Sequence, residues 1–308
     1  MVKNPGWVDI QVNGHLGIDF SDPQLTEADF LRVSEALLAS GTAVFLPTIC
    51  TATTELFRRN SKLIHDAVVR HGLEKSIPGL HFEGPCISSC PGAVGAHKAE
   101  WVREPTPECV AELIDASAGF LRLLTLAAEY PRAAEAIEFA RSRGIRVALG
   151  HQLAGPDDLR RAAAAGAEML THLGNGVPNT LDRHHNPIVA GLAEDALGAM
   201  IITDGHHIPP ELIKVVFRCK GAGKVIVTSD ASRVTGLPPG AYPGIGNPEA
   251  VLEPSGRYFN PVKKCLVGSA VTISQCMEYL AGLGLLDDRE LELVGRTNAL
   301  TWLGLDFV

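Results

Sequence analysis

The sequence predicts an α/β protein of the (β/α)8 TIM-type barrel class, and three observations lead to that prediction. Short apolar runs with no room for a helix alternate with amphipathic segments along most of the chain. Residues 146–176 show the unit most clearly, because a proline and two acids open a helix at Pro156 and Gly166 closes it between two short strands. Eight such strands can be counted, and parallel strands need a crossover helix between them.

The expected elements follow in chain order from local signals. Each strand is a short apolar or β-branched run, and each helix carries apolar residues at helical spacing. Pro47 is expected to end the second strand, because proline cannot donate to the ladder. The predicted strands are 7–10, 42–46, 77–82, 121–126, 145–149, a strand near Met169, 197–202 and 224–228. The predicted helices are 26–40, 54–71, 107–118, 132–143, one opening at Pro156, and 209–219.

The last quarter of the chain departs from this alternation. Residues 231–267 are rich in glycine and proline, with a hairpin expected around Ser255 and Gly256, and 268–304 is expected to be helical. The whole chain, 1–308, is then a single barrel domain. The alternative is an open doubly wound sheet, but no G-x-G-x-x-G follows the first strand, which weakens that reading.

Composition narrows the classes of function. The 308 residues are 46% hydrophobic and 20% charged, which is ordinary for a globular protein. A formal charge of −8 argues against nucleic acid or an anionic membrane as the main partner. The chain shows no signal core and no run of transmembrane length. Its seven cysteines are scattered without a C-x-x-C pair, which indicates reduced thiols in a cytoplasmic protein.

Polar residues follow the strands at their carboxyl ends, where a barrel collects its chemistry. Glu83 follows the third strand, His151 the fifth and His172 the sixth. Taken singly, each residue could equally have a structural role, Glu83 as a loop carboxylate and the two histidines as hydrogen-bonded structural residues. Together, a carboxylate and two histidines form an open metal site with a position left for water. Asp230, after the eighth strand, is either a cap of the next segment or the base that takes a proton from that water.

At these positions the chain resembles the N-acetylglucosamine-6-phosphate deacetylases, a family of the amidohydrolase superfamily. The matching segments run from Pro5 to about residue 275, and each falls at the expected strand end in the family's order. They are PGWVDIQVNG, GLHFEGPCIS followed by GAHK, LGH, THLGNGVPN, ITDGHHI, TSDAS and LVGSAVTI. The resemblance implies a metal-dependent hydrolase that removes the acetyl group from an N-acetyl amino sugar phosphate.

The resemblance also implies catalytic roles. Glu83, His151 and His172 would hold one divalent ion, with zinc as the first choice and iron or another divalent ion as alternatives. Asp230 would act as general base and then as the acid that protonates the leaving amine. His207 would polarise the amide carbonyl and contact the sugar.

Substrate-binding residues follow from the same resemblance. Asn175 and Gly176 match the turn beside the substrate phosphate, and Arg183 matches its guanidinium partner. In the family that arginine can come from a neighbouring subunit, which would imply a homodimer. Further substrate contacts would be Ala96, His97, Leu266, Val267 and Gly268.

The chain departs from the family's pattern in three places. Gln11 and Asn13 stand where many amidohydrolases carry His-x-His, so we expect a single occupied metal site. Residues 184–187 form an insertion after Arg183, in which the two histidines are either plain loop residues or a replacement contact for the anion. We also expect the small β-sandwich that usually flanks the family's barrel to be missing or strongly reduced.

Two other functions remain open from the sequence. One is an amidohydrolase that acts on a different N-acyl amine or on a cyclic amide. The other is a non-catalytic metal-binding homologue, against which the retention of Asp230 argues, because a binding protein does not need the base.

Overall fold

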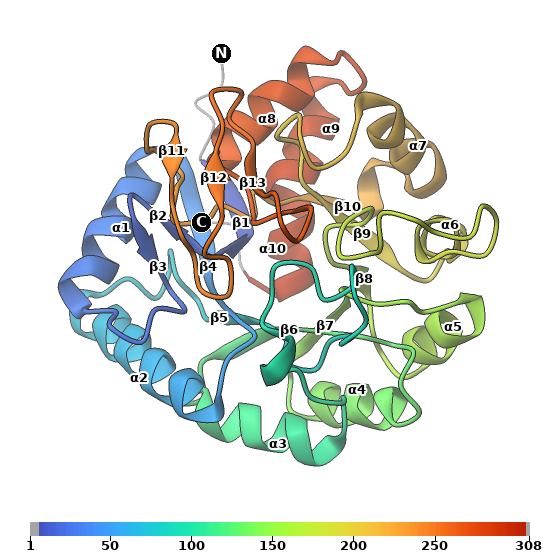
Figure 1. The fold of residues 1–308 in the computed structure, drawn as a ribbon, viewed down its shortest axis with the longest axis horizontal. Helices are drawn as coiled ribbons and strands as arrows, with labels where there is room; N and C mark the ends of the chain where they lie inside the picture. The colour runs from blue at the N-terminus through green and yellow to red at the C-terminus, as the bar shows by residue number, and fades with distance from the viewer. Residues whose placement is uncertain (1–5, 306–308) are drawn as a thin grey trace.

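The core of the computed structural model, which describes residues 6–305, is an eight-stranded parallel barrel (Figure 1). Its strand order, β1-β4-β5-β6-β7-β8-β9-β10, follows the order of the chain. A parallel bridge between Val12 and Ala231 brings the first strand against the segment after the last, and the Asn13 N–H donates to the Ala231 carbonyl at 2.7 Å. The predicted (β/α)8 class is therefore confirmed. Pro5, where the matching segments begin, and residues 306–308 of the predicted domain lie outside the described residues.

The helices form a ring around the barrel (Figure 1). The barrel strands are β1 (Trp7–Val12), β4 (Thr42–Cys50), β5 (Leu80–Glu83), β6 (Leu121–Leu126), β7 (Arg146–Leu149), β8 (Met169–Leu170), β9 (Gly198–Ile201) and β10 (Val225–Val227). The helices of the ring are α1 (Glu27–Ala39), α2 (Thr54–His71), α3 (Pro107–Ala116), α4 (Ala133–Ser142), α5 (Pro156–Ala164), α6 (Pro187–Ala193), α7 (Pro210–Lys220) and α8 (Ile273–Gly282). Short 3-10 turns, η1 (Ala99–Trp101) and η2 (Ala222–Lys224), connect them. Within residues 6–305 no helix is long and apolar enough to cross a bilayer.

Alternation along the strands divides the core into two regions. Val44 and Leu46 of β4 join the cluster inside the barrel, whereas Phe45 between them joins the cluster packed against the helices. Because side chains on a strand alternate between faces, one apolar run supplies both regions. The inner cluster also contains Leu300 and Trp302 of α10 (Asn298–Leu303), so this last helix covers one end of the barrel.

The prediction that Pro47 ends the second strand is wrong. β4 continues to Cys50, and Pro47 pairs with Val12 at an irregularity in the register between β1 and β4. The pairing of β4 with β5 begins only at Thr48, whose hydroxyl accepts the Val12 N–H at 3.1 Å. The proline therefore sits where the ladder is already interrupted, and its missing donor costs little.

Residues 184–187 were interpreted from the sequence as an inserted loop, but the helix α6 begins at Pro187. Asn186 is the N-cap of α6, with its side-chain oxygen accepting the Val189 N–H at 2.9 Å, and Pro187 occupies the first turn. An asparagine followed by proline is a helix-start signal, so the sequence contained the information.

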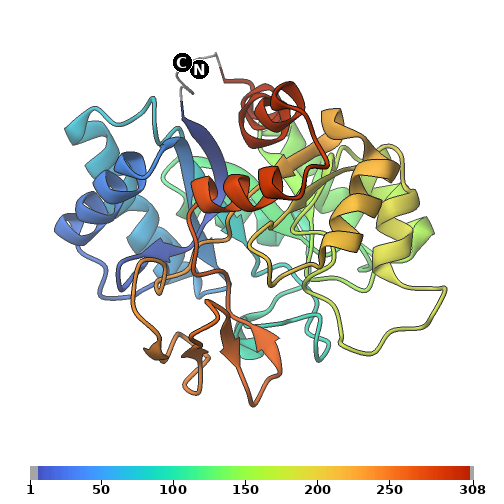
Figure 2. The same cartoon turned by 90° about the horizontal axis from the view of Figure 1, so that it is seen from above.

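A small antiparallel sheet lies on one end of the barrel (Figure 2). Its strands are β11 (Gly240–Ala241), β12 (Val251–Leu252), β13 (Tyr258–Asn260) and β14 (Cys265–Leu266), and Leu252 and Tyr258 belong to its own apolar cluster. The β12–β13 turn contains Ser255 and Gly256, so the predicted hairpin is confirmed. Among residues 6–305, this sheet and the pair β2 (Gly14–His15) and β3 (Ile18–Asp19) contain the strands that lie outside the barrel.

The carboxyl-terminal part is mostly helical from Ile273 onward, with a non-helical connection at 283–287. After α8 come α9 (Asp288–Glu292), the π-helical turn η3 (Leu293–Thr297) and α10. Residues 268–271 precede the Thr272 cap and are not helical, which corrects the start of the predicted helical tail by five residues. Gly268 has a φ of 78°, and a Cβ there would lie 2.9 Å from the Asp230 carbonyl oxygen, so the close approach of this loop to the site requires glycine.

Candidate functional site

Buried imidazoles surround the Glu83 carboxylate at the carboxyl end of β5. The Nε2 atoms of His172 and His151 lie 2.8 and 3.3 Å from Oε1 of Glu83. All three residues are less than a tenth exposed. The structure thus brings the three expected metal ligands together, although they come from three different strand ends.

His97 lies in the same cluster, although sequence reasoning had placed it with the substrate contacts. Its Nε2 is 3.7 Å from Oε2 of Glu83 and 3.2 Å from Nε2 of His151. Glu83, His97 and His151 offer ligand atoms that all lie within 4.8 Å of one another. The GAHK segment identified the residue, but only the folding of its loop across the end of β5 brings it to Glu83.

The donor set suits a divalent transition metal. Nδ1 of His151 lies 2.8 Å from the Ala93 carbonyl, which can only accept, so in the neutral imidazole Nε2 carries the lone pair that faces Glu83. Nδ1 of His172 is buried and has no hydrogen-bond partner within the described residues. Burial, followed by the charge of His151, lowers the pKa of His97 to about 3, which keeps it in the neutral form that metal binding needs. A buried carboxylate together with imidazoles is a donor set typical of divalent transition-metal sites.

Left-handed backbone conformations recur at the strand ends of the site. His151, His172 and Asp230 have φ values of 49°, 31° and 51°. Such values are uncommon for residues other than glycine and cluster at functional sites. His151 and His172 come two residues after the ends of β7 and β8, and Asp230 comes three residues after the end of β10, so the chain turns sharply where each side chain enters the centre.

Asp230 faces this cluster from the opposite side and is held by two amides. Its Oδ1 accepts from Nδ2 of Asn13 at 2.6 Å and from Nε2 of Gln11 at 3.0 Å. The Gln11 amide also donates to Oε1 of Glu83 at 2.9 Å. Burial, followed by the charge of Glu83, raises the pKa of Asp230 to about 6. A carboxyl group that titrates near neutrality can both accept and return a proton.

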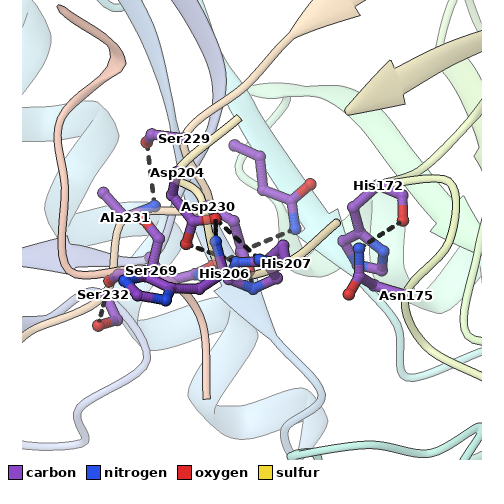
Figure 3. A network of polar contacts seen from close by, with 12 residues as sticks. His172, Asn175, Asp204, His206, His207, Ser229, Asp230, Ala231, Ser232 and Ser269 are labelled. Atoms are coloured by element: carbon purple, nitrogen blue, oxygen red, sulfur yellow. Dashed lines mark hydrogen bonds and ion pairs between the residues drawn. The ribbon is translucent and has the colours of Figure 1, made fainter. Parts of the chain in front are cut away.

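Asp204 and His207 form a buried pair beside Asp230 (Figure 3). Nδ1 of His207 donates to Oδ2 of Asp204 at 2.7 Å, which directs Nε2 toward Asp230, 3.9 Å from its Oδ2. Burial by itself would raise the pKa of Asp204, but the His207 imidazole and two backbone N–H groups hold that pKa at about 2. Asp204 was not among the expected site residues, although its position three residues before His207 is a signal that could have found it.

A cavity of about 490 Å³ opens above these groups. Asp230, His207 and the expected metal ligands line it, and so do the expected substrate contacts Ala96, His97, Asn175, Gly176, Leu266, Val267 and Gly268. Arg183 is exposed and is not part of this lining. His184 and His185 are also exposed and outside this lining, and their backbone N–H groups donate to Asp182.

Comparison with known proteins finds relatives along nearly the whole chain, although no protein-family model matches it. The N-acetylglucosamine-6-phosphate deacetylase of Homo sapiens is 34% identical over 294 residues, which is 89% of this chain and 68% of that protein. The Bacillus subtilis (strain 168) enzyme of the same name is 32% identical over 243 residues, 77% of this chain. That match spans 60% of the Bacillus subtilis protein, so the chain corresponds to part of the relative's length.

A solved structure shows the same arrangement of elements. It is a variant of N-acetyl-D-glucosamine-6-phosphate deacetylase from Mycobacterium smegmatis in complex with N-acetyl-D-glucosamine-6-phosphate. The TM-score is 0.84 at 29% identity, over 98% of this chain and 77% of that chain.

Proposed function

This chain belongs to the N-acetylglucosamine-6-phosphate deacetylase family, and from that premise we propose that it hydrolyses the amide of N-acetylglucosamine 6-phosphate to glucosamine 6-phosphate and acetate. The observation that carries the proposal is Asp230, a buried carboxylate directed into the cavity opposite Glu83 and its histidines. A carboxyl group with a pKa of about 6 has little structural value in such a place, but it suits proton transfer.

Asp230 performs both proton transfers of the reaction. Its carboxylate takes a proton from water as the water oxygen attacks the amide carbon. It then returns that proton to the nitrogen, the C–N bond breaks, and acetate and the free amine leave. His207, held by Asp204, donates toward the carbonyl oxygen as negative charge develops there.

Glu83, His151 and His172 are the residues that would hold a divalent metal ion, with His97 next to them. A bound divalent ion would supply Lewis acidity, lowering the pKa of water and polarising the amide carbonyl. We favour one ion per chain, because Gln11 and Asn13 donate hydrogen bonds to Glu83 and Asp230 where other amidohydrolases carry two histidines. The carboxylate and imidazole donors favour zinc, with iron or another divalent ion as alternatives.

Phosphate recognition would use the Asn175–Gly176 turn and Arg183. Arg183 lies outside the cavity of its own chain, which is compatible with a homodimer in which it reaches the neighbouring site. The reduced cysteines and the absence of long apolar helices among residues 6–305 are compatible with a cytoplasmic enzyme of amino sugar metabolism.

The decisive experiment measures acetate release by the purified chain, stripped of metal and then supplied with zinc, iron or manganese. Turnover of N-acetylglucosamine 6-phosphate that depends on the metal is expected. Faster turnover of another N-acyl amine or of a cyclic amide would reassign the substrate and keep the hydrolase. Metal binding without hydrolysis of any of these amides would instead identify a non-catalytic homologue.

A further inference from the structure

Four basic side chains line the cavity, and three of them already have acidic neighbours. The four are Lys98, Arg233, Arg257 and Lys264. Lys98 lies 3.9 Å from Glu100 and Arg257 lies 3.7 Å from Glu253, and the charge of Arg233 offsets part of the rise in the pKa of Asp19 that burial causes. The ammonium group of Lys264 makes no ion pair within 4 Å among residues 6–305. Among these four residues, Lys264 is the one whose charged group makes neither an ion pair nor a hydrogen bond with another described residue, since the Arg233 guanidinium donates to the Pro243 carbonyl at 3.1 Å.

Lys264 is also placed against the turn expected beside the substrate phosphate. It lies in the turn between β13 and β14, on the sheet at the end of the barrel (Figure 2), and its carbonyl accepts from Nδ2 of Asn179 at 3.0 Å. Asn179 follows Gly176 by three residues, so the hairpin and the Asn175–Gly176 turn meet at the same wall of the cavity. Gly174 and Gly176 have φ values of 102° and 64°, which makes a tight turn whose backbone N–H groups can approach an anion.

The flexible side chain of Lys264 and the tight Asn175–Gly176 turn therefore lie on the same side of the cavity. A lysine has a long stem and three donors, so its head can follow a phosphoryl group that is not rigidly fixed. Arg183 is not in position to do this within the same chain, since it lies outside the cavity lining.

We infer that Lys264 is a specificity-determining residue that binds the substrate's phosphoryl group within its own chain. Preference for a phosphorylated amino sugar is then partly a property of each subunit and does not depend wholly on Arg183. The inference rests on the proposed function, because it adds a contact to the same substrate in the same cavity.

The test compares N-acetylglucosamine with its 6-phosphate in wild type, Lys264→Met, Lys264→Arg and the control Lys214→Met. Lys214 is an exposed lysine on α7, outside the cavity lining. Lys264→Met should raise KM for the 6-phosphate about tenfold with kcat nearly unchanged, because an exposed charge-assisted contact contributes modestly. It should leave kcat/KM for the unphosphorylated sugar unchanged. Lys264→Arg should restore most of the preference, and Lys214→Met should behave as wild type.

Two results would overturn the inference. One is an unchanged ratio of kcat/KM for the two sugars in Lys264→Met. The other is an equal loss on both sugars, which would mean that the residue only supports the hairpin. If wild type hydrolyses neither sugar, the proposed function fails separately, and calorimetric binding of inorganic phosphate decides the question. Weaker phosphate binding in Lys264→Met than in Lys214→Met supports the inference, and equal binding refutes it.

Discussion

Replacing Asp230 with asparagine should make the metal-free protein more stable while almost abolishing its activity. The pKa of Asp230 rises from 3.8 to about 6, mainly because the carboxylate is buried and faces Glu83. A folded-state pKa above the unfolded one means that ionisation weakens the fold as the pH rises from about 4 to about 6, and that the loss stays constant above. The pKa difference corresponds to about 3 kcal/mol as an upper limit.

Asparagine removes that cost and keeps the local contacts. Its side-chain oxygen can still accept from Asn13 and Gln11, whose donors lie 2.6 and 3.0 Å from Oδ1 of Asp230. We therefore expect Asp230→Asn to unfold at a higher urea concentration at pH 7.5, with a gain on the order of 1–3 kcal/mol. The gain should shrink at pH 5. Turnover should fall by roughly two to four orders of magnitude, because an amide cannot accept the proton from water.

Urea unfolding of metal-free protein, followed by tryptophan fluorescence at both pH values, measures the first effect. Glu74→Gln, a change of an exposed carboxylate outside the cavity lining, is the matched control and should change neither stability nor activity. A variant less stable than wild type at pH 7.5 would refute the account of the buried charge. A folded, metal-loaded Asp230→Asn protein with near wild-type deacetylation would refute the mechanism.

Three further predictions follow from the site. Elemental analysis should find close to one divalent ion per chain in wild type and much less in His151→Ala, and a value near two would contradict the single site. Arg183→Ala should raise KM for the 6-phosphate by roughly tenfold or more, since a guanidinium–phosphate contact is lost; a wild type without preference for the phosphate would remove the basis of this prediction. Asp204→Asn should lower the pKa of His207, because Asp204 is a principal cause that raises it against burial. Imidazole NMR titration measures that shift, and kcat should fall roughly tenfold; an unchanged pKa would mean that Asp204 does not orient His207.

The barrel could be predicted from the sequence because its signals are local. Residues 54–71 carry their own cap and helical periodicity, and residues 121–126 are an uninterrupted apolar run; both elements have the predicted bounds. In a barrel whose strand order follows the chain, the order of strands also fixes which strand ends are neighbours. The meeting of Glu83 with His151 and His172 could therefore be anticipated from strand positions alone.

The contacts that loops make could not be predicted from local sequence signals and strand order. Pro47 lies within β4 because the partner strand is irregular opposite it, which is a property of two segments and not of one. His97 reaches Glu83 because its loop folds across a strand end. Lys264 lies at the cavity because the β13–β14 hairpin, far along the chain, is hydrogen-bonded to Asn179.

By itself, the sequence determined the fold class, the order of the strands and the residues that stand at their carboxyl ends, since periodicity and capping act over a few residues. Only the tertiary structure decided which loop side chains join these strand-end residues at the site. It also decided which charged side chains there have a partner of opposite charge, and how far burial raises the pKa of Asp230. Those properties depend on distances between segments separated by tens to hundreds of residues, and no local pattern specifies such distances.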